Sequence, residues 1–278
     1  MERLEALRLV AAQALHGELV FPTGLDVSLT LLRALDDPDC HVDHAVRLVK
    51  GDPLLAARVV AVANASIYCR PGQQTADLRQ AVARIGLRTT RTLAVAIATR
   101  RLAGTPQSPR LREAANRLWV HTSEVAALAQ VIARRVSHVD PETAFFAGVV
   151  HEIGGFYLIS RAADMPTLLD GDPGDWTEDN EAIVGRAILA RLDIPPTVCA
   201  AIEAMWEGLR SLPPASLGDT LLLADELALT PSPLYTTDAT RTADSAPQID
   251  AVVNERTLSE ILAESASEVA ELAAALRQ

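Results

Sequence analysis

The chain has 278 residues, of which 49 % are apolar and only 4 % aromatic, so its core must consist mainly of Leu, Ala, Val and Ile. The 25 basic and 36 acidic side chains give a formal net charge of −11, which excludes an overall positive field for nucleic acid or an anionic membrane. Three widely spaced cysteines without a Cys-x-x-Cys pair indicate neither a disulfide framework nor a zinc site, but a reducing cytoplasm: Cys40, Cys69 and Cys199.

The N-terminal stretch, residues 1–17, mixes acidic and basic side chains with apolar ones, among them Glu2, Arg3, Glu5 and Arg8. This mixture predicts an amphipathic helix rather than a signal peptide. No uncharged apolar run approaches the roughly 20 residues needed to span a bilayer. We therefore expect a protein that does not cross a membrane.

Helix-start signals follow along the chain with little between them. A serine, threonine or aspartate stands before a helical period, often with a proline in the first turn, at Asp52-Pro53, Ser108-Pro109, Asp140-Pro141, Thr177 and Ser216, and Pro195-Pro196 starts a further helix. Gly86 predicts the end of one helix and a tight entry into the next. Alternation with a period of two is nearly absent. The sequence therefore predicts an all-α protein without a sheet, with residues 18–228 in one compact unit whose two lobes meet near His121.

The last part of the chain has a different composition. Residues 230–250 are rich in Thr, Ser, Pro and Asp, which predicts a flexible linker. Within residues 251–278, Thr257 and Glu260 form a capping-box pattern before one apolar helical stripe. A lone helix is marginal in water. We therefore expect this amphipathic helix to dock on its own domain rather than on another chain, and the oligomeric state stays open.

Several short motifs occur in a specific order and spacing. They are Phe21-Pro22-Thr23, Leu35-Asp36-Asp37-Pro38, Asp52-Pro53-Leu54-Leu55-Ala56-Ala57-Arg58, Ala63-Asn64-Ala65-Ser66, Ala81-Val82-Ala83-Arg84-Ile85-Gly86-Leu87, Leu118-Trp119-Val120-His121-Thr122-Ser123 and Ala147-Gly148-Val149-Val150-His151-Glu152-Ile153-Gly154. Together they resemble the HDOD family, the HD-related output domains, over residues 18–228. The resemblance implies an HD-domain, phosphodiesterase-like helical bundle that acts as an output or interaction module in bacterial signalling.

The resemblance also implies a metal site. HD proteins bind a divalent metal through a His, a His-Asp pair and a distant Asp, and these match His121, His151-Glu152 and Asp225. Imidazoles and carboxylates can hold such a metal and leave a position open for water. Glu152 replaces the Asp of the pair and adds one methylene. The resemblance therefore implies a vestigial site, with a bound divalent metal as the alternative to no cofactor.

Other departures from the family pattern favour loss of catalysis. Gly155 stands where catalytic members often place a phosphate-binding Lys, and Glu181 and Met205-Trp206 replace histidines of a second metal site. Without a metal, His121, His151 and Glu152 would form a buried hydrogen-bonded cluster.

A second candidate site is a row of arginines at spacings of three and four residues. Arg84, Arg88 and Arg91 could present a cationic face to an anionic ligand or an acidic partner. The alternative is an ordinary solvated helix face.

The sequence thus favours a non-enzymatic, cytoplasmic bacterial signalling module of the HDOD type that binds a protein partner and no nucleic acid. Two other hypotheses stay open. One is a residual metal-dependent phosphohydrolase that acts on a nucleotide or cyclic dinucleotide, and the other is a sensor that binds a ligand in the vestigial pocket.

Overall fold

A computed structural model describes residues 2–22, 25–169, 180–208, 211–235, 252–253 and 256–278. Its helices are α1 (Arg3–Leu15), α2 (Leu25–Leu35), α3 (Val42–Lys50), α4 (Pro53–Asn64), α5 (Leu78–Leu102), α6 (Pro109–Ile132), α7 (Pro141–Val150), α8 (Ile153–Arg161), α10 (Asn180–Arg191), α11 (Pro196–Glu207), α12 (Leu217–Leu227) and α13 (Leu258–Arg277). A π turn, η1 (Ala133–Ser137), follows α6, and a 3-10 turn, η2 (Pro166–Leu169), follows α8. The only strands in the described ranges are two residues long, β1 (Val252–Val253) and β2 (Arg256–Thr257), and they pair antiparallel. The predicted all-α class is confirmed.

Several of the predicted helix starts owe their position to side-chain caps, but Ser108 makes no capping hydrogen bond at the start of α6, and the predicted cap Thr177 lies outside the described residues. Asp52 accepts hydrogen bonds from the backbone N–H groups of Leu54 and Leu55 at the start of α4, and Asp140 accepts one from Thr143 at the start of α7. Ser216 and Thr257 form complete capping boxes at α12 and α13. These bonds satisfy N–H groups that have no partner within their own helix.

α5 contains the predicted break at Gly86. This residue has φ +80° and ψ 170°, a conformation that a side chain would strain, so two helical segments meet there at a kink. The predicted helix end at Gly86 is confirmed.

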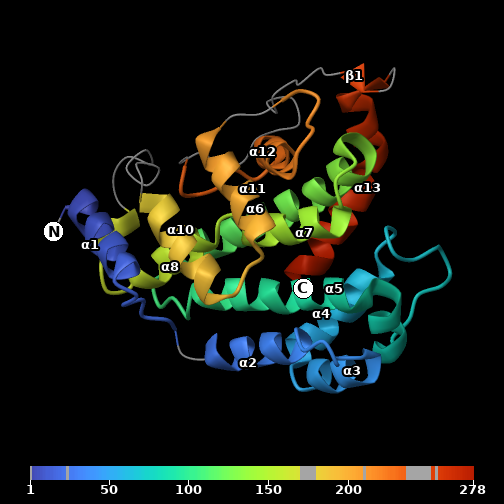
Figure 1. The fold of residues 1–278 in the computed structure, drawn as a ribbon, viewed down its shortest axis with the longest axis horizontal. Coiled ribbons are helices and arrows are strands. Elements are labelled where there is room, and N and C mark those ends of the chain that lie inside the picture. Colours follow the sequence, from blue (N-terminus) through green and yellow to red (C-terminus); the bar gives the residue numbers. More distant parts are fainter. Residues whose placement is uncertain (1, 23–24, 170–179, 209–210, 236–251, 254–255) are drawn as a thin grey trace.

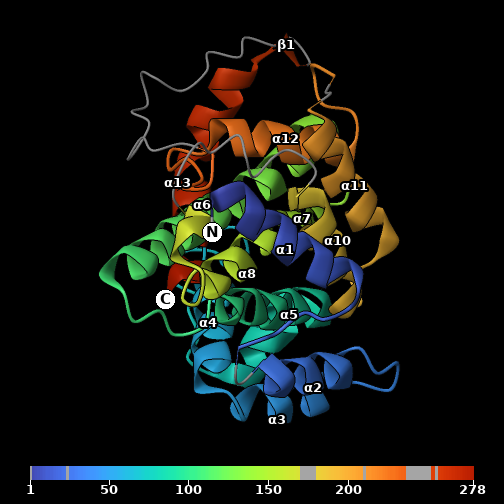
Figure 2. The same ribbon diagram turned by 90° about the vertical axis from the view of Figure 1, so that its left-hand side faces the viewer.

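Two lobes share α5 (Figures 1 and 2). In the first lobe, α2, α3 and α4 pack against α5. In the second lobe, α6, α7, α8, α10, α11 and α12 pack together, and α7 and α8 contact the other side of α5. Although α1 comes first in the chain, it packs on α10 and η2 and so belongs to the second lobe.

The C-terminal helix α13 lies along α6 and contacts α4 of the same chain. Its buried side includes Leu258, Ile261, Leu272 and Leu276. Glu268 accepts hydrogen bonds from Arg134 and Arg135, at 2.5 and 3.1 Å, and Glu271 accepts one from the backbone N–H of Ser66. The helix is therefore tied to both lobes by apolar and charged contacts.

The predicted linker starts too early in the chain. Residues 230–235 are placed in the structure, and Thr230, Pro231, Ser232 and Leu234 are buried. Their backbone and side chains find partners on α6 and α10, which composition alone does not reveal. The rest of the predicted linker, residues 236–250, lies outside the described residues. We call residues 230–235 the strap.

One segment, residues 141–161, is long and apolar enough to cross a membrane by length and composition, and no other helix in the described residues passes the same test. It comprises α7 and α8, and 89 % of its most apolar window is buried. Its apolar character is that of a core segment.

Candidate metal centre

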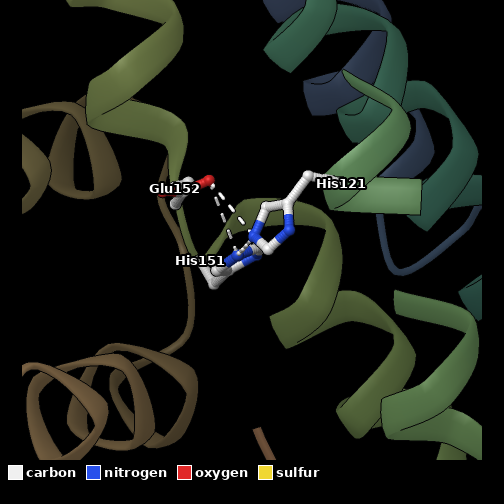
Figure 3. Close-up of side chains that lie close together, drawn as sticks. All are labelled: His121, His151 and Glu152. Carbon is white, nitrogen blue, oxygen red and sulfur yellow. Dashed lines mark hydrogen bonds and ion pairs between the residues drawn. The ribbon is translucent and has the colours of Figure 1, made fainter. Parts of the chain in front are cut away.

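The four predicted ligands come together in the second lobe. His121 lies in the middle of α6, His151 and Glu152 lie between α7 and α8, and Asp225 lies on α12. Figure 3 shows the side chains of His121, His151 and Glu152 converging. Glu152 has a non-helical backbone, with φ −109° and ψ 32°, so the helix breaks at the pair. Despite its extra methylene, the Glu152 carboxylate reaches the cluster.

The ligand atoms are close enough to share one cation. His121 Nε2 lies 3.3 Å from His151 Nε2, 3.4 Å from Glu152 Oε2 and 3.0 Å from Asp225 Oδ1. His151 Nε2 lies 3.9 Å from the same Glu152 oxygen and 3.7 Å from that of Asp225. Ligands of a tetrahedral Zn-type ion are spaced by about 3.4 Å, given metal–nitrogen bonds of about 2.05 Å. The spacing of His121, His151 and Glu152 fits such a group, and Asp225 lies within 3.7 Å of both histidines.

The other ring nitrogens are already bonded. His121 Nδ1 lies 2.8 Å from the carbonyl oxygen of Thr230, and His151 Nδ1 lies 2.7 Å from that of Gly148. A carbonyl only accepts, so both Nδ1 atoms carry the proton. In a neutral ring Nε2 then offers a lone pair to the cluster, as it does in metal-binding histidines.

Burial and charge also determine the protonation of the cluster. Burial opposes a charge on His121, but the Glu152 and Asp225 carboxylates outweigh it and raise the pKa of His121 to about 9. Burial and the charge of His121 lower the pKa of His151 to about 4. Burial raises the pKa of Glu152 to about 7. Without a metal, an imidazolium at His121 is therefore the cation that faces the carboxylates.

Two features decide whether the residues fit a metal. The oxygens of Glu152 lie buried beside the histidine nitrogens and make no well-formed hydrogen bond within the described residues, although the Ser232 and Tyr235 hydroxyls lie near enough to lower the pKa of Glu152. The donor set of two imidazoles and two carboxylates is one that divalent transition metals prefer. The residues therefore fit a divalent cation as well as they fit a protonated histidine.

The strap closes over this cluster. The Thr230 carbonyl accepts from His121, while the backbone N–H and hydroxyl of Thr230 donate to Glu124 at 2.8 and 3.1 Å. Leu234 is 3 % exposed and lies over Gly155, where a Cβ atom would overlap the Cδ1 atom of Leu234. The space that a longer side chain at position 155 would need is therefore filled by the strap.

Of the positions of the missing second metal site, Glu181 lies next to the strap. Glu181, on α10, is buried and accepts a hydrogen bond from the hydroxyl of Tyr235. Burial raises the pKa of Glu181 to about 8. Met205 is buried in the core, and the Trp206 ring lies against Gly185 with the Arg186 guanidinium over it. The positions of the second site are thus occupied by an acid that is hydrogen-bonded within the protein and by two packed side chains.

The arginine row is not a single cationic face. Arg84 donates to the carbonyl oxygens of Ala63 and Gln73, at 2.9 and 2.8 Å. Arg88 binds Asp140, and Arg91 binds Asp36. Each arginine binds a different segment of the chain, and two of the three charges are paired.

Sequence reasoning missed the strap and its partner Glu124. The composition of residues 230–250 hid them, since Thr230 and Ser232 are polar side chains that find partners only in the fold. The sequence signal was Leu234-Tyr235, a large apolar and aromatic pair in a segment otherwise read as a linker.

Comparison with known proteins identifies one family and several solved structures with a similar fold. The HDOD domain model matches residues 21–207. No curated protein matches the chain. A provisionally assigned metal-dependent phosphohydrolase from Shewanella amazonensis is 21 % identical, with a TM-score of 0.68 and 98 % of each chain covered. An HDOD domain protein of unknown function from Geobacter sulfurreducens is 24 % identical, with a TM-score of 0.62 and coverage of 99 % of this chain and 97 % of that chain.

A provisionally assigned signal transduction protein from Marinobacter aquaeolei is 18 % identical, with a TM-score of 0.59. The match covers 100 % of this chain and 67 % of that protein's chain. At these identities, the solved structures establish the shared fold alone.

Proposed function

This chain belongs to the HDOD domain family, and from that premise we propose that it is a non-catalytic bacterial signalling module that acts in the cytoplasm through a protein partner. In this proposal the cluster of His121, His151, Glu152 and Asp225 is a structural centre of the second lobe. It holds α6, α7, α8 and α12 together rather than turning over a substrate.

The closed strap is the observation that carries this proposal. A phosphohydrolase must admit a phosphate ester to its metal-bound water. Here His121, His151 and Glu152 are at most 2 % exposed, and the strap bonds directly to His121. The Asp225 side chain is 26 % exposed, so a substrate could touch Asp225 but could reach the two histidines and Glu152 only after the strap had moved.

The surroundings of the cluster also lack the expected electrostatic help. Phosphoryl transfer needs a second cation, from a side chain or metal, to stabilise the charge that develops on the phosphate. Gly155 offers no cation, and Leu234 occupies the adjacent space. Glu181 adds a proton-binding acid rather than a metal-binding imidazole.

A residual metal-dependent phosphohydrolase is the second candidate, and the spacing of the four ligand atoms favours it. His121, His151, Glu152 and Asp225 would hold the divalent cation. Such a cation lowers the pKa of bound water and polarises a phosphate oxygen. In that case the strap would act as a lid that keeps the enzyme inactive.

An activity assay separates the two candidates. The full chain is incubated with Mn²⁺, Mg²⁺ or Fe²⁺ and with cyclic dinucleotides, nucleotides and p-nitrophenyl phosphate. The same assay is applied to a Leu234→Ala, Tyr235→Phe double variant that loosens the strap. We expect no turnover above the buffer control from either protein.

Two other outcomes contradict the proposal. Turnover by the unmodified chain that His151→Ala abolishes would establish a working hydrolase. Turnover only by the loosened variant, again lost on His151→Ala, would establish an enzyme that the strap inhibits. Metal analysis of the untagged protein accompanies the assay, since bound metal without turnover still agrees with a structural centre.

The partner is sought separately. The tagged chain, retained on resin, is exposed to extract of its native host, and captured proteins are identified by mass spectrometry. A heat-unfolded sample of the same chain is the control. A specific partner supports the signalling role, and repeated failure to capture one weakens it.

A further inference from the structure

The first lobe contains a cavity of about 980 Å³. It lies between α2, α3, the start of α4 and the end of α5. Its wall is mainly apolar, from Leu31, Ala34, Leu48 and Pro53, and its charged lining residues are Asp52 and Arg101. Small-molecule sites are concave, mostly apolar and roughly 300–1,000 Å³ in volume, with a few polar groups that orient the ligand.

Behind this cavity, Arg58 is buried without a polar partner. Its side chain is 0 % exposed, and none of its three guanidinium nitrogens has a hydrogen-bond acceptor among the described residues. Its contact is with the Trp119 ring, at 5.2 Å from guanidinium carbon to ring centroid. A buried cation normally requires a paired anion and hydrogen bonds, because it has lost its hydration.

Other arginines gather around Arg58. Arg100 lies over the same Trp119 ring at 5.7 Å, and Arg101 follows it in the chain. Burial, with the charges of Arg100 and Arg101, lowers the pKa of Arg58 to about 10, so this side chain stays charged at neutral pH. We call Arg58, Arg100 and Arg101 the arginine cluster.

Asp52 is the carboxylate that acts on Arg58, and its two oxygens also accept hydrogen bonds from other groups. Its Oδ1 accepts from the backbone N–H groups of Leu54 and Leu55, at 3.0 and 3.2 Å, and its Oδ2 accepts from Arg101 at 2.8 Å. Among the described side chains, Arg58 and Arg101 thus share one carboxylate, and Arg100 adds a further positive charge. In a chain of net charge −11, this local excess of positive charge is an exception.

Arg101 is the member of the cluster that lines the cavity. It donates to Ser28 and to Asp52, both at 2.8 Å, so its guanidinium is held in place at the wall. Two bonds leave three of its five N–H groups for another acceptor. Planar guanidinium groups bind phosphate oxygens well, and a phosphate would supply the negative charge that Asp52 alone does not.

We propose that this cavity binds a phosphate-bearing small molecule of nucleotide size. Its phosphate lies against Arg101, with Arg58 and Arg100 behind it as a source of positive potential. The apolar or planar body of the molecule lies against Leu31, Leu48 and Pro53. This site is separate from the histidine and carboxylate cluster, so the proposal stands whether or not that cluster is catalytic.

Calorimetric titration of the full chain at constant ionic strength tests the proposal. The probes are the four common ribonucleoside 5′-monophosphates, glucose 6-phosphate, inorganic phosphate, and adenosine and glucose as dephosphorylated controls. We expect at least one monoester to bind saturably with one site per chain. Its dephosphorylated form should bind at least about tenfold more weakly, as expected from the loss of charge-assisted hydrogen bonds.

Arginine variants locate the site. Arg101→Gln should weaken the best monoester by about tenfold or more, and Arg100→Gln should weaken it less, because Arg100 does not line the cavity. Arg88→Gln is the matched control, since it removes the same charge from the same helix, and it should leave the Kd unchanged. Circular dichroism and the melting temperature verify folding, and Arg100→Gln keeps the test valid if Arg101→Gln unfolds.

Three results would overturn the proposal. The first is that no monoester binds saturably. The second is that inorganic phosphate binds as tightly as the best monoester, which would mean an adventitious ion only. The third is that the folded arginine variants bind as the wild type does.

Discussion

The two lobes each bury a polar cluster, and the two clusters differ in how their charges are balanced. In the second lobe, two histidines face two carboxylates, and the strap satisfies the outer nitrogen of His121. In the first lobe, Arg58 and Arg101 share the Asp52 carboxylate beside an open cavity, and Arg100 adds a further positive charge. The histidine and carboxylate cluster of the second lobe is balanced within the protein, whereas the arginine cluster of the first lobe carries more positive than negative charge among the described residues. The residues that match a known catalytic pattern thus lie in the closed cluster of the second lobe. The excess positive charge lies in the first lobe, where the sequence contains no catalytic motif.

The largest expected effect tests whether the closed cluster is balanced by its own members. His121→Ala leaves Glu152 and Asp225 without their facing cation, so we expect a loss of about 3–5 kcal/mol in the free energy of unfolding. Urea unfolding of metal-free protein at pH 7 measures it. His16→Ala, at an exposed position, should change stability by about 0.5 kcal/mol or less. A loss below about 1 kcal/mol for His121→Ala would mean that the cluster is not a structural centre.

The next effect concerns closure by the strap. Leu234→Ala removes a buried side chain over Gly155, and we expect a loss of about 2–4 kcal/mol. The same urea titration measures it, with Leu15→Ala, at an exposed leucine, as the matched control. If both leucine variants unfolded at the same urea concentration, the strap would not be part of the folded core.

A smaller effect tests the pairing of Gly155 with Leu234 directly. Gly155→Ala should cost about 1–3 kcal/mol, because its new methyl group overlaps Leu234 and approaches Leu118. In the Leu234→Ala background the same change should cost much less, because the space is then free. A double-mutant cycle measures this coupling. Strict additivity of the two changes would show that the strap does not fill the space beside Gly155.

The smallest effect concerns an arginine outside both clusters. The Arg88 side chain is 68 % exposed and pairs with Asp140 at the surface. Arg88→Gln should therefore change the free energy of unfolding by about 1 kcal/mol or less, and raised salt should reduce the difference further. Thermal unfolding at low and high salt measures it. A loss above about 2 kcal/mol would remove the distinction between surface and buried arginines.

Local signals predicted much of this molecule. Asp52, Asp140, Ser216 and Thr257 cap helices as their sequence positions indicate, because capping depends on neighbours within three residues. The four metal-type ligands also converge as the family resemblance implies, although they come from three separate helical regions.

Long-range partners could not be predicted in the same way. Arg84, Arg88 and Arg91 form a regular row in the sequence, but each is bound by a segment that only the fold brings near. Arg58 lies on the same face of α4 as Leu55 and Val62, which are both buried. Its place on an apolar face was the available signal, and its isolation from acceptors became visible only in three dimensions.

Because α1 packs on the second lobe, the first lobe is an insertion in the sequence of the second lobe. The chain enters and leaves the first lobe through two connecting segments that lie next to each other. The incoming connection, at Val20 to Pro22, and the outgoing one, at Ala103 to Pro106, line a common hollow, and a Cβ on Gly104 would lie 3.6 Å from Pro22. Because α5 packs on both lobes and α13 contacts both α4 and α6, the folded core holds these two connections side by side. Pro22 and Gly104 also line the larger cavity. A molecule seated there would touch both connections at once, so its binding would stabilise the place where the chain enters and leaves the first lobe.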